Sequence, residues 1–319
     1  MHDLYSNSIN SPAGRLAEIL LKKLPKVSGN GQLPIDMRLR LDKLMAAPGN
    51  PGKLARIRLA AAVAFLFEQA PEWTNANIIP LFEWAYPEAG DAWSALKYAN
   101  YIGSPELFRL MKASFLELFG RSDITSEELR IFADWLTTIL ISNRNRQSDP
   151  YSLSALEARA ALRRAGAGSL ASVGHRLATE MERAKPQDKA KQWRSIVGPV
   201  LESIWPIDVD IQSNSANFKL VQILISTGDA FLEAAKVIIP LLRPEDTKSH
   251  PTVYSIANAP KELFKLSSST LLDILVALVG EVKAGNIHSL DEALSRIRKH
   301  GPGLANSRKF QKLLSLAAT

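Results

Sequence analysis

The stretch TSEELRIFADWLTTILI, residues 125–141, decides the fold class of this chain. Its apolar residues recur at steps of three and four, the spacing of one face of an α-helix: Leu129, Phe132, Leu136, Ile139 and Leu140. Thr125 and Glu128 stand at the spacing of a capping box, in which each side chain binds the other residue's backbone amide. The stretch therefore predicts an amphipathic helix that begins directly after Thr125.

The same signals recur along the chain. Three further stretches have apolar residues at helical spacing, and they are 54–68, 105–119 and 289–301. Two pairs, Ser104–Pro105 and Ser11–Pro12, combine a favourable N-cap residue with a proline in the first turn of a helix. A second capping box is formed by Ser289 and Glu292. Strand-like alternation occurs in IDVDI at 207–211, but five residues without a partner strand cannot form a sheet. We therefore expect an all-α chain.

Short turns containing Pro, Gly or Asn join roughly 14 expected helices, so neighbouring helices should be antiparallel. Stacked antiparallel pairs predict a HEAT-like α-solenoid, and an extended multi-helix bundle is the alternative because no internal consensus repeats. The polar stretch SNRNRQSDPYS at 142–152 predicts a joint. We expect an N-terminal helical repeat segment at 1–150 and a more basic C-terminal one at 151–319, together forming one continuous solenoid.

Composition narrows the class of protein. The 319 residues are 46% hydrophobic and include no cysteine, which excludes disulfides and thiolate metal sites. The longest apolar run, LAAAVAFLF at 59–67, is too short to cross a bilayer. The first ten residues lack the pattern of an export signal. A cytoplasmic protein without a membrane partner is expected.

Candidates for catalysis are few. The Gly52-Lys53 pair lacks the spacing and the following Ser or Thr of a phosphate-binding loop. The five histidines are not spaced as paired metal ligands on a helix, and no Gly-x-Ser-x-Gly elbow occurs. We therefore assign no catalytic, metal or cofactor-binding residue and expect no enzyme, although a site that converges from distant helices stays open.

Positive charge is uneven along the chain. The net charge is +7, and residues 161–319 carry 21 Lys and Arg against 15 Asp and Glu. Three basic stretches lie at 38–58, 159–194 and 296–312. The arginines considered for an interaction are Arg38, Arg40, Arg56, Arg58, Arg159, Arg163, Arg164 and Arg176. Arg159, Arg163 and Arg176 form one stripe if a single helix continues through the nearby glycines. Such arrays are typical of phosphate-backbone binding, so a nucleic-acid-binding helical repeat is one hypothesis.

Aromatic residues gather between residues 72 and 103, where Trp73, Trp84 and Trp93 are the largest. Packing between helices is one interpretation of this cluster. A protein-contact surface is the other, because exposed aromatic residues mark binding sites for protein partners.

A longer phrase goes beyond these general patterns: LESIWPIDVDIQSNSANFKLVQILISTGDAFLEAAKVIIPLLRP from residue 201. Its Ile-Trp-Pro-x-Asp stop, Thr-Gly-Asp-x-Phe turn and closing IIPLL resemble a C-terminal helical region of large bacterial anti-phage defence proteins. The opening NSPAGRLAEILLKKL is similar to the start of that region. Many such proteins carry an N-terminal sirtuin-like effector that consumes NAD.

The resemblance implies a sensor or scaffold that acts through protein contact, with an effector domain, an effector subunit or a phage protein as partner. This chain contains no sirtuin-like glycine-rich or histidine motif, so NAD cleavage does not carry over to it. The first functional hypothesis is therefore a protein-interaction module without catalytic activity or cofactor, and nucleic-acid binding is the alternative.

Overall fold

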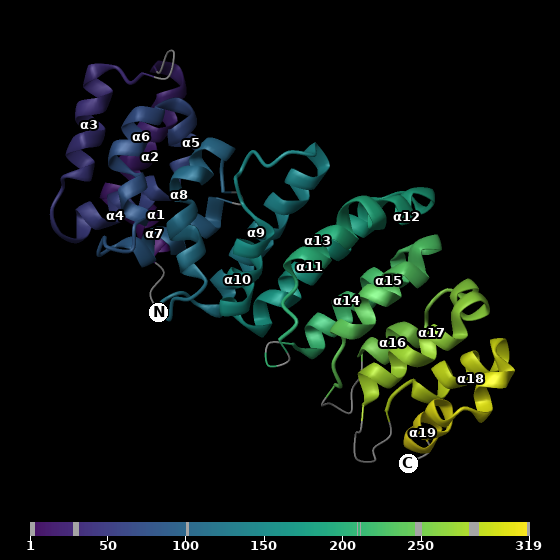
Figure 1. Cartoon of the computed structure of the whole chain (residues 1–319). Coiled ribbons are helices and arrows are strands. Elements are labelled where there is room, and N and C mark those ends of the chain that lie inside the picture. The colour runs from purple at the N-terminus through teal and green to yellow at the C-terminus, as the bar shows by residue number, and fades with distance from the viewer. Residues whose placement is uncertain are drawn as a thin grey trace. The chain divides into compact units, whose positions relative to one another are not determined.

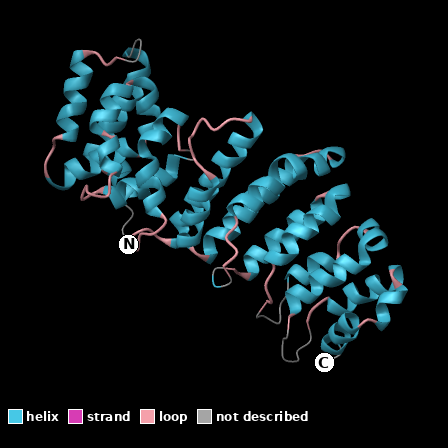
Figure 2. Ribbon diagram, in the orientation of Figure 1, coloured by secondary structure: helices cyan, strands magenta, loops and turns pink. Residues whose placement is uncertain are grey.

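The computed structural model describes residues 4–27, 32–99, 102–208, 210, 212–245, 251–280 and 287–317. Within these ranges the chain is all-α, as predicted, with helices joined by turns and no β-strand (Figure 2). The alternating stretch 207–211 lies partly outside them. None of the described helices is long and apolar enough to pass through a membrane.

Two compact units make up the chain. Unit 1 comprises residues 1–135 and 150–152, and unit 2 comprises residues 136–149 and 153–319. The boundary falls inside one helix, α9 (Ser126–Arg146). Each unit is described separately below.

Unit 1 is a helical bundle around α4. Its elements are α1 (Leu4–Asn10), α2 (Pro12–Val27), α3 (Ile35–Met45), α4 (Gly49–Ala60), α5 (Val63–Gln69), α6 (Pro71–Asn77), the 3-10 helix η1 (Ile79–Phe82), α7 (Ala89–Leu96), η2 (Lys97–Ala99), α8 (Pro105–Leu118) and the first half of α9. Helix α4 contacts α1, α2, α3, α5 and α7. Its apolar residues are therefore buried on several sides.

Unit 2 contains stacked helix pairs. After the end of α9 come α10 (Ala155–Ala165), α11 (Ala167–Arg183), η3 (Pro186–Asp188), α12 (Lys189–Gln192), the π-helical turn η4 (Trp193–Val197), α13 (Gly198–Ile204), α14 (Asn214–Ser226), η6 (Gly228–Ala230), α15 (Phe231–Ile238), η7 (Ile239–Leu241), α16 (Pro251–Ala257), α17 (Lys261–Val279), α18 (Leu290–His300), η8 (Pro302–Asn306) and α19 (Arg308–Ala317).

The chain of unit 2 alternates between two rows of helices. One row runs α11, α14, α16, α18, and each helix contacts the next (Figure 1). The other row runs α10, α13, α15, α17, α19, again with contact at each step. Consecutive helices α10 and α11, α14 and α15, α16 and α17, and α18 and α19 also touch across the rows. This is the pairing that short turns predict. The HEAT-like repeat itself stays a prediction, because the pairs share no sequence motif.

Several predicted helix starts are confirmed. Helix α9 begins at Ser126, where the amide and hydroxyl of Thr125 donate to Glu128 Oε2 at 2.9 and 2.8 Å. The amide of Glu128 donates back to Thr125 Oγ1 at 3.3 Å, which completes the capping box. At the start of α8, the Leu107 amide donates to Ser104 Oγ at 3.3 Å.

Two predictions of local structure were wrong. Residues 54–68 do not form one helix, because the chain turns at Ala61–Ala62 between α4 and α5, and α5 then packs against α6. Ser289 makes no capping hydrogen bond from its side chain, because it has a left-handed backbone with φ of 64°. In both cases tertiary packing set a backbone geometry that the local signal did not contain.

Gly14 allows a tight corner between α1 and α2. Its amide donates to Ser11 Oγ at 2.9 Å, so Ser11 caps α2 as predicted. A Cβ at position 14 would lie 1.9 Å from the carbonyl oxygen of Ser8, a backbone atom that has little room to move. Any residue other than glycine therefore forces α1 away from α2.

We expect Gly14→Ala to lower the free energy of unfolding by about 2 kcal/mol, because overpacking costs more than the ~1 kcal/mol that alanine gains in helix propensity. Urea denaturation of the full chain, followed by circular dichroism, measures this difference. The control is Arg15→Ala at the neighbouring exposed position, which should change stability by less than about 0.5 kcal/mol. An equal effect of the two substitutions would contradict the close approach.

Candidate functional site

The four arginines of the first basic stretch are paired with acids in unit 1. Arg38 lies 3.8 Å from Asp42, and the other pairs are Arg40–Asp36 at 4.0 Å, Arg58–Glu18 at 3.9 Å and Arg56–Glu88 at 2.6 Å. Arg38 and Arg40 are exposed, whereas Arg56 and Arg58 are mostly covered, with side chains 12% and 17% exposed. Much of the positive charge of this stretch is therefore balanced within the unit.

Arg56 joins three parts of unit 1. Its Nε and Nη2 donate to Glu88 at 2.9 and 2.6 Å, and its Nη1 donates to the carbonyls of Met45 and Ala47 at 3.1 and 2.9 Å. The bidentate hydrogen bonds with Glu88 raise the pKa of Arg56, and burial partly opposes them. Because these donors are occupied, Arg56 fixes the end of α3 to Glu88, and we call this set of contacts the Arg56 clamp.

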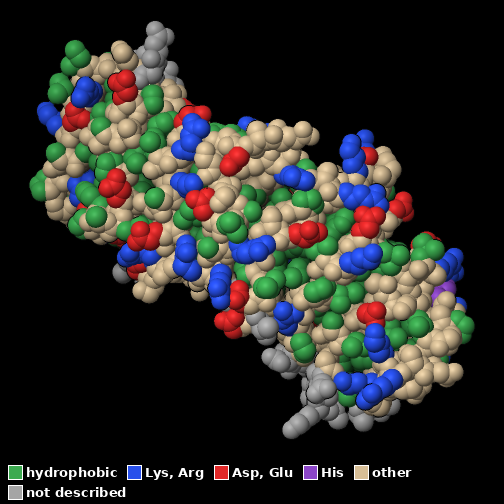
Figure 3. All heavy atoms as spheres, viewed as in Figure 1, with side chains coloured by type: hydrophobic (Ala, Val, Ile, Leu, Met, Phe, Trp, Pro, Cys, Tyr) green, Lys and Arg blue, Asp and Glu red, His purple; other side chains and the backbone are tan. Residues whose placement is uncertain are grey.

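The arginines of the second stretch do not form the stripe expected of them. Helix α10 ends at Ala165, because Gly166 has φ of 77°, so Arg176 lies on a different helix from Arg159 and Arg163. Arg159 donates to the carbonyl of Glu202 at 2.6 Å, and Arg163 pairs with Asp208 at 2.7 Å. Arg164 is exposed at the end of α10, and Arg176 is half-buried on α11. In Figure 3, Lys and Arg side chains lie among Asp and Glu side chains over the visible face.

The side chains of Trp73, Trp84 and Trp93 mainly pack within unit 1. Trp93 is fully buried and Trp73 is 7% exposed, so neither presents a ring to a partner. The indole of Trp73 donates to Asp42 Oδ1 at 2.7 Å, and that of Trp93 donates to the carbonyl of Phe82 at 3.0 Å. Trp84 is half-buried.

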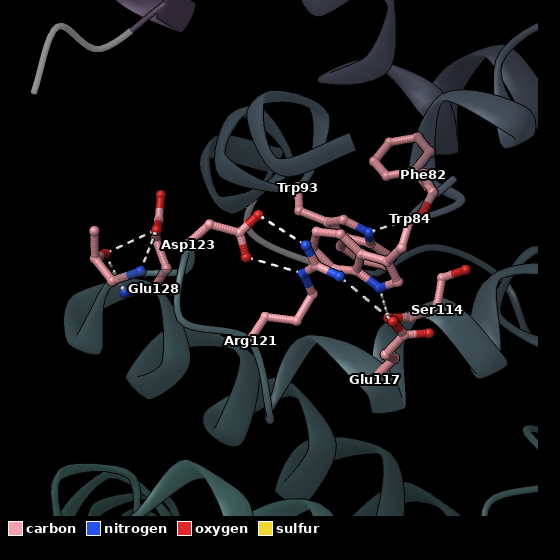
Figure 4. A network of polar contacts seen from close by, with 9 residues as sticks. Phe82, Trp84, Trp93, Ser114, Glu117, Arg121, Asp123 and Glu128 are labelled. Carbon is pink, nitrogen blue, oxygen red and sulfur yellow. Dashed lines mark hydrogen bonds and ion pairs between the residues drawn. The ribbon is translucent and has the colours of Figure 1, made fainter. Parts of the chain in front are cut away.

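A cluster of polar contacts covers Trp84 (Figure 4). The guanidinium of Arg121 lies 4.2 Å from the ring centroid, a cation–π contact, and the indole donates to the Ser114 carbonyl at 2.9 Å. Arg121 also donates to both carboxylate oxygens of Asp123 at 2.9 and 3.1 Å, and these bonds lower the pKa of Asp123 against the opposing effect of burial. All three groups are thus held by neighbours in unit 1.

A cavity of about 830 Å³ lies in unit 2. Its walls are the end of α9 with the following loop, the start of α10, and the segment from α12 to α13. The lining includes apolar Leu140, Leu153, Ala155, Ile196, Pro199 and Val200, and polar Asn143, Arg144, Asn145, Gln147, Ser148, Asp149, Lys191, Ser195 and Ser203. We call it the α9–α13 cavity.

Asn143 is a buried polar residue in the wall of this cavity. Its side chain is buried, with the residue only 8% exposed, and its Nδ2 donates to Asp149 Oδ1 at 2.7 Å. The same Asp149 oxygen accepts the amide of Leu153 at 3.1 Å, which holds the loop after α9 in place. Asn143 Oδ1 is buried and has no hydrogen-bond donor among the residues that the structure describes. A buried acceptor of this kind costs free energy until a donor reaches it.

The lining also includes two residues of an unusual turn, Ser195 and Ile196 of η4. Residues of η4 follow the π-helical pattern, and such turns occur often at functional sites. Arg144 Nε donates to the carbonyl of Ser195 in this turn at 3.0 Å, and Ser195 Oγ donates to the Lys191 carbonyl at 2.7 Å. Arg144 and Lys191 therefore place two positive charges beside the opening.

This arrangement suits binding better than catalysis. The hydroxyls of Ser195 and Ser203 donate to backbone carbonyls, so no general base activates them. Within the described ranges, no group of three or more His, Asp or Glu residues is placed to hold a metal ion. His2 and His250 lie outside those ranges.

Part of this cavity coincides with the polar stretch 142–152, which the sequence identified only as a joint. A buried asparagine in such a stretch carries no local signal. The residues of α12 to α13 that complete the site lie about fifty positions further on, as the bond between Arg144 and Ser195 illustrates.

No protein-family model matches the chain. It is similar to the uncharacterized protein y4cA of the bacterium Sinorhizobium fredii, with 22% identity over 324 residues. The match covers 99% of this chain but 26% of that protein, so the chain spans about a quarter of its relative's length. A crystal structure of an engineered protein aligns over 100% of this chain and 98% of its own, with 15% identity and a TM-score of 0.31, a likeness too low to support an argument.

Proposed function

We propose that this chain is a non-catalytic interaction module that binds an extended segment of a protein partner in the α9–α13 cavity. The observation that carries the proposal is the α9–α13 cavity itself, whose lining combines apolar side chains with the polar groups of Asn143, Asn145 and Gln147.

The cavity walls fit such a segment. A volume of about 830 Å³ lies within the range of ligand sites in proteins. Leu140, Ile196 and Val200 offer an apolar surface for one side chain of the segment. Asn145 and Gln147 at the rim can each donate and accept hydrogen bonds with its backbone.

The architecture and the relative support a module within a larger assembly. Stacked helix pairs such as those of unit 2 present extended surfaces that suit partner binding. The y4cA protein is a bacterial chain of much greater length, in which this region is one part. We extend the proposal to a sensor or scaffold role in anti-phage defence on the resemblance of residues 201–243. The partner is then an effector domain or subunit, or a phage protein.

The test compares proteins captured by four full-length baits from phage-infected and uninfected bacterial cells, using quantitative mass spectrometry. Two baits damage the cavity by different means, Asn143→Leu by removing the amide that donates to Asp149 in the cavity wall and Ala155→Trp by filling space. The control bait is Glu182→Gln at an exposed position of α11. We expect one partner to fall about tenfold with both cavity variants, equivalent to ~1.4 kcal/mol of binding free energy, and to remain with wild type and control.

Identical partners in equal amounts on all four baits would refute binding at the cavity. A partner that depends on the cavity but is captured equally without phage would leave the interaction module standing and remove the infection-sensing role.

A further inference from the structure

A second, independent feature of unit 2 is a set of basic side chains where α17 begins and α18 ends. The two helices pack against each other. Arg296 of α18 lies over the ring of Phe264 of α17, 4.0 Å from its centroid. Gly301 lies so close to Ser268 that a Cβ on it would be 3.1 Å from that residue's Cβ. The last turns of α18 therefore run beside the first turns of α17.

This packing brings five basic groups together, which we call the α17–α18 cationic face: Lys261, Lys265, Arg296, Lys299 and His300. Burial, and then the positive charges of the other four members, lower the pKa of the His300 imidazole. Each of those charges is thus close enough to disfavour a proton on His300.

The lysines of this face are Lys261, Lys265 and Lys299. In contrast to Arg163 and Arg194, none of Lys261, Lys265 and Lys299 has an ion-pair partner among the described residues. All three are exposed.

The helix dipole accounts for the positions of only some of these basic residues. Lys299 and His300 lie in the last turn of α18, where the negative end of the dipole favours positive groups. Lys261 is the first residue of α17, where the dipole is positive and a lysine is unfavourable. The neighbouring acid Glu262 does not pair with it. Stability alone therefore does not account for the arrangement.

We propose that the α17–α18 cationic face binds the phosphate backbone of a nucleic acid without reading its sequence. Lysine ammonium groups are compact charges with rotatable donors, and they bind phosphate oxygens from many directions. A carboxylate partner is bound best by an arginine whose guanidinium donors are free to form two parallel hydrogen bonds. The guanidinium of Arg296 already donates to the carbonyls of Ala257 and Ala259. The face therefore suits phosphate better than an acidic peptide.

This binding is separate from the α9–α13 cavity and does not rest on it. It also differs from the arrays expected at 38–58 and 159–194, where many arginines are paired. Residues Lys261 and Lys265 lie outside all three basic stretches, and only the packing of α17 on α18 joins them to Arg296 and Lys299.

The experiment measures anisotropy of fluorescein-labelled 30-nucleotide DNA and RNA, single- and double-stranded, with the full chain between 50 and 200 mM KCl. We expect micromolar binding that weakens steeply with salt, as for sequence-independent phosphate contacts. The double variant Lys261→Gln/Lys265→Gln should bind at least about tenfold more weakly at 50 mM KCl. The slope of log K against log[KCl] should become shallower by about 2, roughly 1 for each lysine removed.

The matched control is Lys185→Gln/Lys189→Gln, which removes the same charge at the same spacing elsewhere in unit 2 and should retain binding. Equal weakening by both double variants would show general charge attraction and overturn the proposal. So would absence of salt-dependent binding, equal affinity for polyglutamate, or binding only to vesicles of anionic phospholipid. As a local readout, the ring-proton NMR resonances of His300 should shift on adding oligonucleotide in the wild type, and an unchanged His300 would also contradict the assignment.

Discussion

Replacing Trp93 with alanine is expected to lower the free energy of unfolding of unit 1 by about 4 kcal/mol, the loss typical of removing a large buried aromatic side chain. Trp93 is fully buried, and its ring lies 5.0 Å from Phe82 and 5.9 Å from both Phe115 and Phe132. The substitution leaves a cavity among these rings. It also removes the donor to the Phe82 carbonyl.

Hydrogen–deuterium exchange of the full chain measures this effect and locates it. Peptides from unit 1 should exchange faster in Trp93→Ala, whereas those from unit 2 serve as the internal reference. The conservative variant Trp93→Phe keeps a ring and loses the indole N–H, so we expect a loss of about 1–2 kcal/mol. Protection of unit 1 that is unchanged in Trp93→Ala would mean that the ring is a surface platform rather than part of the core.

Replacing Arg56 with methionine is expected to cost about 3 kcal/mol, because a mostly buried carboxylate then loses its partner. Glu88 is 15% exposed at its side chain, so water replaces the guanidinium only in part. The carbonyls of Met45 and Ala47 lose their donor as well. Methionine retains most of the apolar stem, so the measured loss reflects the polar contacts.

Arg38→Met is the matched control, since it removes an arginine from the same basic stretch. Its side chain is 68% exposed and lies 3.8 Å from Asp42, and such surface pairs contribute less than about 0.5 kcal/mol. Urea denaturation of the two variants and of Arg56→Met/Glu88→Gln completes the comparison. We expect the double variant to recover part of the loss, because the charge left on Glu88 is then removed. Equal stability of Arg56→Met and Arg38→Met would rule out the clamp.

Helix positions could be predicted where the signal is local. The capping boxes at Thr125–Glu128 and Ser154–Glu157 have the same spacing and the same hydrogen bonds, and only the first was identified from the sequence. At Ser289 the spacing is present but the left-handed backbone prevents the bond. The capping pattern therefore predicts the helix start at both sites, because α18 begins directly after Ser289, but the capping hydrogen bond forms only where the N-cap backbone is extended.

The roles of the charged residues could not be predicted, because ion pairs join residues that are distant in sequence. Arg56 and Glu88 are 32 positions apart, and nothing near Arg56 distinguishes it from exposed Arg38. The sequence indicates both as candidates for an interaction. The α17–α18 cationic face was missed for the same reason, since Lys261 and Lys299 come from different helices.

The sequence by itself determined the all-α class, the start of helices such as α9, and the absence of thiol chemistry, because periodicity, capping and composition act through neighbouring residues. Only the tertiary structure decided that Arg56 is a clamp, that Trp93 is core, and that buried Asn143 binds Asp149 in the wall of a cavity. Each of these depends on which distant segment packs against the residue. Burial and electrostatic pairing are properties of that packing, and the local pattern does not encode them.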